Sequence, residues 1–78
     1  MIEKVAVIGA GTMGRGIAFA TALKGLTVNL QDINQTALEQ SKAYIKEQFE
    51  TAIKLGKISE EEAADNFEKV HYKTNLEE

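Results

Sequence analysis

Three glycines near the N-terminus have the spacing of a phosphate-binding loop. They are Gly9, Gly11 and Gly14, in the order Gly-x-Gly-x-x-Gly. Gly9 permits a tight turn, Gly11 lets a pyrophosphate approach the backbone because it has no Cβ, and Gly14 allows a helix to pack closely on a strand. Unpaired N–H groups and the dipole at the start of the following helix also favour phosphate. The spacing therefore indicates a nucleotide cofactor, without specifying a reaction.

Asp32 is the second feature that indicates a binding site. It follows a second apolar run, residues 26–30, and its distance from Gly14 is close to the offset of roughly 20 residues expected for a carboxylate that binds the adenosine ribose. Its charge should repel the 2′-phosphate of NADP, and no Lys or Arg follows before Lys42. The sequence therefore predicts NAD as the cofactor.

Strand and helix signals on both sides of the glycines predict how these residues are positioned. The apolar run 5–8 predicts a strand over residues 2–8. A helix should run from Thr12 or Met13 to Lys24, ended by Gly25, and a second strand should cover residues 26–31.

A long helix over residues 35–55 should follow, capped by Asn34 and ended by Gly56. Its apolar stripe keeps the helical period, with Ser41 as a small gap, and consists of Leu38, Ser41, Tyr44, Ile45, Phe49, Ala52 and Ile53.

The remaining residues add a short helix and a third strand. Ser59 and Glu62 form a capping box before a helix that extends through Phe67, and residues 69–74 alternate as a strand does. Residues 75–78 resemble the first turn of a further helix. The order β-α-β-α-(α)-β predicts an α/β fold with a parallel sheet, which is one half of a Rossmann-type domain. We expect residues 1–78 to be this N-terminal half, with the catalytic half and a C-terminal helical domain outside the chain.

The predicted topology leaves one face of the sheet uncovered. Two right-handed crossovers that step in one direction place both connections on the same face. The other face, with alternate residues of 5–8 and 26–30, should then be exposed and apolar, and the first strand should be an open edge. We expect the chain by itself to associate.

Composition excludes several classes of function. The 78 residues include 9 basic and 12 acidic side chains, so the net charge of -3 argues against nucleic acid. The absence of cysteine excludes a disulfide framework and a thiolate metal site, and a single histidine excludes a histidine-rich one. No segment has the length and apolarity of a membrane span or a signal peptide. These features predict a cytoplasmic protein with no metal ligands and no membrane partner.

The chain resembles a known family over its whole length. The segment KVAVIGAGTMGRGIA, the strand ending in Asp32, and the long helix leading to GKISEEEA are similar to the start of 3-hydroxyacyl-CoA dehydrogenases, and most of all to the bacterial 3-hydroxybutyryl-CoA dehydrogenases. The resemblance implies that the full-length protein is an oxidoreductase and a homo-oligomer. Its reaction would be the NAD-dependent interconversion of 3-hydroxyacyl-CoA and 3-ketoacyl-CoA in fatty-acid or butyrate metabolism.

The resemblance also assigns site residues. The residues that match the family's pyrophosphate loop and ribose carboxylate are Gly9, Ala10, Gly11, Thr12, Met13, Gly14 and Asp32. The family's catalytic histidine and glutamate have no counterpart in this chain, so no catalytic residue is assigned, and His71 is expected to be structural or solvent-facing. Lys54 and Lys57 either contact CoA phosphates or are solvated lysines at a helix end, where cations are favoured.

Two other functions stay open at this stage. The first is another NAD-linked dehydrogenase of the same fold, of the 3-hydroxyacid or 6-phosphogluconate type, although the long helix and the GKISEEE segment argue against it. The second is a nucleotide-binding module without catalysis. A histidine and a glutamate at the family's positions beyond residue 78 would favour the dehydrogenase.

Overall fold

The computed structural model describes residues 4–74 and shows a three-stranded parallel sheet with three helices. The elements in chain order are β1 (Lys4–Ile8), α1 (Thr12–Leu23), β2 (Thr27–Gln31), α2 (Gln35–Lys54), α3 (Glu60–Phe67) and β3 (Val70–Lys73). The strand order is β1-β2-β3, with both neighbouring pairs parallel. The predicted Rossmann-type half-domain is therefore confirmed. The predicted start of the first strand and the helical turn over residues 75–78 lie outside the described residues.

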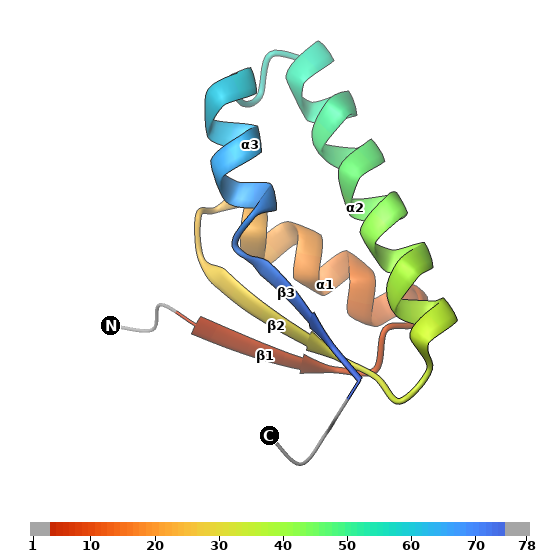
Figure 1. Ribbon diagram of the computed structural model, residues 1–78. Coiled ribbons are helices and arrows are strands. Elements are labelled where there is room, and N and C mark those ends of the chain that lie inside the picture. The colour runs from red at the N-terminus through yellow and green to blue at the C-terminus, as the bar shows by residue number, and fades with distance from the viewer. Residues whose placement is uncertain (1–3, 75–78) are drawn as a thin grey trace.

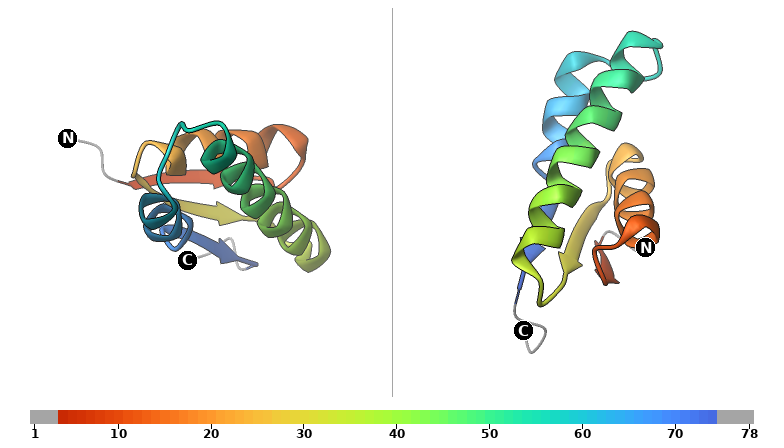
Figure 2. Two further views of the ribbon diagram at one scale, coloured as in Figure 1. Left: turned by 90° about the horizontal axis from the view of Figure 1, so that it is seen from above. Right: turned by 90° about the vertical axis from the view of Figure 1, so that its right-hand side faces the viewer.

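The three helices cover one face of the sheet. All of them lie above the strands in Figure 1, and α1 contacts both α2 and α3. Figure 2 shows α3 running beside the C-terminal part of α2. This is the arrangement expected when successive crossovers step in the same direction.

The core lies between this face of the sheet and the helices. Val28 and Leu30 of β2 are fully buried and meet the buried stripe of α2, which includes Leu38 and Ile45. On the same stripe, the ring of Phe49 makes edge-to-face contacts with two other phenylalanines, from α1 and α3, at centroid distances of 5.1 and 6.3 Å. Such pairs contribute beyond the area that they bury. The predicted apolar stripe of α2 is confirmed.

The helix caps follow the sequence signals with one difference. The Asn34 side chain accepts a hydrogen bond from the Ala37 N–H at 3.1 Å, and Ser59 Oγ accepts one from the Glu62 N–H, also at 3.1 Å. The return contact of the capping box runs from the Ser59 hydroxyl to the Glu62 carboxylate at 3.3 Å, instead of from the Ser59 backbone N–H. Both caps therefore satisfy donors that the helix itself cannot pair.

The open face of the sheet is less apolar than expected. On β1 it exposes Ala6 and Ile8, and Ile8 is 72% exposed. Strand alternation places the polar residues of β2 and β3 on this face, namely Thr27, Asn29, His71 and Lys73, together with Gln31, which is itself buried. Within residues 4–74 no helix covers this face, as expected, but the expectation of an apolar face is wrong for β2, because Val28 and Leu30 point toward the helices. His71 is exposed on this face, which agrees with the solvent-facing alternative expected for it.

Candidate functional site

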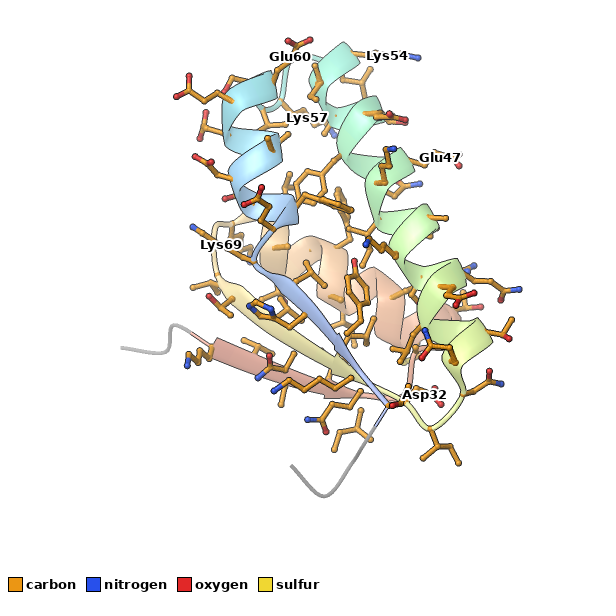
Figure 3. The ribbon with its side chains drawn as sticks, in the orientation of Figure 1. Asp32, Glu47, Lys54, Lys57, Glu60 and Lys69 are labelled. Atoms are coloured by element: carbon orange, nitrogen blue, oxygen red, sulfur yellow. The ribbon has the colours of Figure 1, made fainter. Side chains whose placement is uncertain are left out.

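The glycine loop and Asp32 lie side by side at the carboxyl edge of the sheet (Figure 3). They meet there because β1 and β2 pair in parallel with Ile8 opposite Gln31, so the residues that follow each strand are neighbours. The Gly9 N–H donates to the Gln31 carbonyl at 2.7 Å, and the Ala10 N–H donates to Asp32 Oδ2 at 2.8 Å. The structure thus brings together the two features that the sequence singled out.

The three glycines of the loop have different surroundings. Gly9 has a φ of 99°, which only glycine adopts readily, and this conformation turns the chain out of β1. A Cβ on Gly14 would overlap the carbonyl oxygen of Gly9 and lie 3.0 Å from its carbonyl carbon. A Cβ on Gly11 would meet no atom within 4 Å. Gly9 and Gly14 are therefore required by the fold, whereas the space beside Gly11 is open to a ligand.

The first turn of α1 presents free backbone donors to this space. The helix begins after Gly11, has no side-chain cap and has no acidic residue in its first turn. The Arg15 N–H bonds to the Gly11 carbonyl at 3.0 Å, but within residues 4–74 the N–H groups of Thr12, Met13 and Gly14 have no acceptor. Thr12 and Met13 are exposed. Unpaired N–H groups at the positive end of a helix dipole favour a bound phosphate.

The Asp32 carboxylate is fixed and ionised beside the loop. Hydrogen bonds from the N–H groups of Ala10 and Asn34, each at 2.8 Å, lower the pKa of Asp32 below its usual 3.8. These bonds use one acceptor site on each oxygen, whereas a carboxylate has about four such sites. Asp32 therefore keeps acceptors for the hydroxyls of a ligand at neutral pH.

Ser41 is a residue of this site that sequence reasoning missed. It is fully buried on α2, and its Oγ lies 2.8 Å from the carbonyl oxygens of both Ala10 and Ala37. From the sequence it was only a small gap in an apolar stripe. A polar residue in an otherwise apolar stripe was the available signal, because a buried hydroxyl needs a partner.

Three other candidates from the sequence lie away from this edge. Lys54 and Lys57 are exposed at the opposite end of α2 from Asp32 (Figure 3), and His71 is on the open face of the sheet. A pocket of about 330 Å³ beside Lys54 is also lined by Glu50 and Glu60. Two carboxylates disfavour a phosphate, so this pocket lends little support to a CoA contact at Lys54.

The part of the chain that the structure describes has neither a cluster of metal ligands nor a membrane-spanning helix. Within residues 4–74 no three histidine, aspartate or glutamate side chains lie close enough together to hold a metal ion. None of the three described helices combines the length and the apolarity needed to cross a bilayer.

Comparison with known proteins places the chain beside one group of enzymes. Residues 4–78 match the family model described as 3-hydroxyacyl-CoA dehydrogenase, NAD binding domain. The structure of (S)-3-hydroxybutyryl-CoA dehydrogenase PaaH1 from Ralstonia eutropha has a TM-score of 0.88 and 35% identity, over 96% of this chain and 26% of that one. The 3-hydroxybutyryl-CoA dehydrogenase from Escherichia coli K12 has a TM-score of 0.89 and 33% identity, over 97% of this chain and 16% of that one.

A plant relative shows the same similarity in sequence. The glyoxysomal fatty acid beta-oxidation multifunctional protein MFP-a of Brassica napus is 42% identical over 60 residues, which are 77% of this chain and 8% of that protein. The chain thus spans only a small part of each of these three proteins.

Proposed function

This chain belongs to the 3-hydroxyacyl-CoA dehydrogenase family and matches the model of its NAD binding domain, and from that premise we propose that Gly9–Gly14 and Asp32 bind the adenosine diphosphate half of NAD. The observation that carries this proposal is the position of the Asp32 carboxylate, which lies against a loop whose helix has free N–H groups. A pyrophosphate needs donors and a ribose needs acceptors, and this edge of the sheet offers both.

Different groups of the chain would bind the pyrophosphate and the ribose of NAD. The backbone of Gly11, Thr12, Met13 and Gly14 would hold the pyrophosphate, and Asp32 would accept hydrogen bonds from the ribose hydroxyls. The negative charge of Asp32 disfavours the extra phosphate of NADP. Lys42, the first basic residue after Asp32, has its ammonium over the ring of Tyr72 at 5.9 Å. Bound NAD would supply the hydride acceptor.

We further propose that residues 1–78 are the N-terminal half of a dinucleotide-binding domain within a longer oxidoreductase. Its reaction would be the interconversion of 3-hydroxyacyl-CoA and 3-ketoacyl-CoA in fatty-acid or butyrate metabolism, with the catalytic residues outside this chain. The names of the similar proteins support this reaction. We also propose a homo-oligomer and a cytoplasmic location. The lack of cysteine supports that location, although the plant relative is named as glyoxysomal.

Calorimetric titration of the chain and of the complete polypeptide that carries it tests the proposal. NAD should bind to both and NADP much more weakly. NADH should form from 3-hydroxybutyryl-CoA only with the complete polypeptide. Equal affinity for the two cofactors would contradict the role of Asp32. NADH formation by the 78-residue chain would contradict the assignment of catalysis to residues outside it.

A further inference from the structure

The backbone N–H and C=O of Ala10 are both held by side chains. Its N–H donates to Asp32 Oδ2 at 2.8 Å, and its carbonyl oxygen lies 2.8 Å from the Ser41 hydroxyl. Ala10 itself is only 3% exposed. The loop between β1 and α1 is thereby tied to the end of β2 and to α2, two elements that are distant in the sequence.

The Ala10 carbonyl depends on Ser41 for its hydrogen-bond donor. A serine hydroxyl has a single proton, and here that proton can go to the oxygen of Ala10 or of Ala37. The Ala37 carbonyl lies inside α2, where the helix itself provides a donor. Within the described residues, the Ala10 carbonyl has no donor other than Ser41. Losing a buried partner costs more than losing an exposed one.

The surroundings of Ser41 indicate that its hydroxyl donates to the loop at Ala10. Ser41 is 0% exposed and lies on the stripe of α2 between Leu38 and Ile45, which are also buried. One turn further along α2, the ring of Tyr44 lies 4.5 Å from the guanidinium of Arg15 in α1. The same part of α2 therefore contacts both the loop and the helix that the loop begins.

We propose that Ser41 is a positioning residue for the cofactor loop. Together with Asp32 it fixes the backbone on both sides of Ala10, so that the N–H groups of the following residues already face the ligand before NAD binds. This inference depends on the proposed function, because it assigns the loop to NAD. Fixing a loop in its bound shape strengthens binding by removing the entropy cost of ordering it.

Two variants separate this role from a purely structural one. Ser41→Ala removes the hydroxyl at the loop. Asn66→Ala is the matched control: Asn66 is also buried, at 8% exposure, and its amide donates to the Leu23 carbonyl at 3.4 Å, at the other end of α1. Both changes remove a buried side-chain donor to a backbone carbonyl beside α1.

The first readout is amide hydrogen exchange of Ala10 in the protein without NAD. The second is NAD affinity by titration. For the complete polypeptide, the KM for NAD and the kcat are measured as well. Ser41→Ala should speed exchange at Ala10 and weaken NAD binding by about 5- to 30-fold, mainly through KM. Asn66→Ala should leave both readouts near wild type, even if it lowers the melting temperature.

Each outcome is decisive. If Ser41→Ala lowers stability but matches Asn66→Ala in Ala10 exchange and in NAD affinity, Ser41 has only a structural role. If Ser41→Ala does not fold, Ser41→Cys keeps the size with a weaker donor, and unchanged exchange and affinity there overturn the inference. If the wild type does not bind NAD, the proposed function fails, and the exchange measurement still decides whether Ser41 holds the loop.

Discussion

Replacing Gly14 with alanine should destabilise the fold, although alanine is the better helix residue. The helix preference alone favours alanine by about 1 kcal/mol. Against it stands an overlap between the new methyl group and the Gly9 carbonyl oxygen, with the Val7 side chain only 3.5 Å away. Overpacking usually costs about 1–3 kcal/mol, and a backbone obstacle belongs at the upper end or above it. Gly9 cannot easily move, because its N–H is bonded to the Gln31 carbonyl. We expect a net loss of about 2 kcal/mol.

Thermal unfolding followed by circular dichroism measures this loss. For a chain of this size, about 2 kcal/mol corresponds to a melting temperature lower by roughly 8–16 °C. Gly16→Ala is the matched control, because Gly16 lies in the same helix and a Cβ there would meet no atom within 4 Å. Its melting temperature should be equal or higher. Protein concentration must be held constant, since association adds to apparent stability. If Gly14→Ala is as stable as Gly16→Ala, the close approach of α1 to the loop is not what requires glycine.

Four further predictions follow from the same site and sheet. Gly11→Val should keep the melting temperature and abolish NAD binding in a titration, because its side chain would enter only the open space beside the loop; unfolding of this variant would contradict that reasoning. Asp32→Ala should weaken NAD binding by about 10- to 100-fold, and unchanged affinity would refute the ribose contact. The N–H groups of Ala10 and Asn34 lower the pKa of Asp32, so the stability that its ionised form contributes is present above pH 3.8 and is lost only as pH falls through the lower folded-state value. An NMR titration of this carboxyl with a midpoint at or above 3.8 would contradict this. The 78-residue chain should be a dimer or larger by light scattering, because Ala6 and Ile8 are exposed on an edge strand; a stable monomer would show that this exposure is tolerated.

The sequence predicted those features that have local signals. Glycine spacing, caps and apolar periodicity gave the order of the elements, and parallel pairing then placed the loop beside Asp32. The contact of Ser41 with Ala10 was not predicted, because it depends on how α2 packs on the loop, and no local pattern specifies that.

The composition of the open face was misjudged for a related reason. Leu26, Val28 and Leu30 suggest an apolar run over residues 26–30, but residues 27–31 alternate between polar and apolar. Alternation indicates a strand with one buried face, and that is what the structure shows. On the open face, within residues 4–74, the exposed apolar side chains are those of Ala6 and Ile8 in β1.

The two hydrogen bonds that hold the backbone of Ala10 also bear on the order in which the molecule folds. Contacts between residues close in sequence generally form first, so β1, α1 and β2 can assemble, with Asp32 already beside the loop, before α2 docks. The Ala10 carbonyl gains its partner only when Ser41 arrives with α2. In this order of events, the full affinity for the cofactor is reached only when α2 docks, after β1 and β2 have paired. By the reciprocity of linked equilibria, a cofactor held by the loop would in turn hold α2 in its docked position.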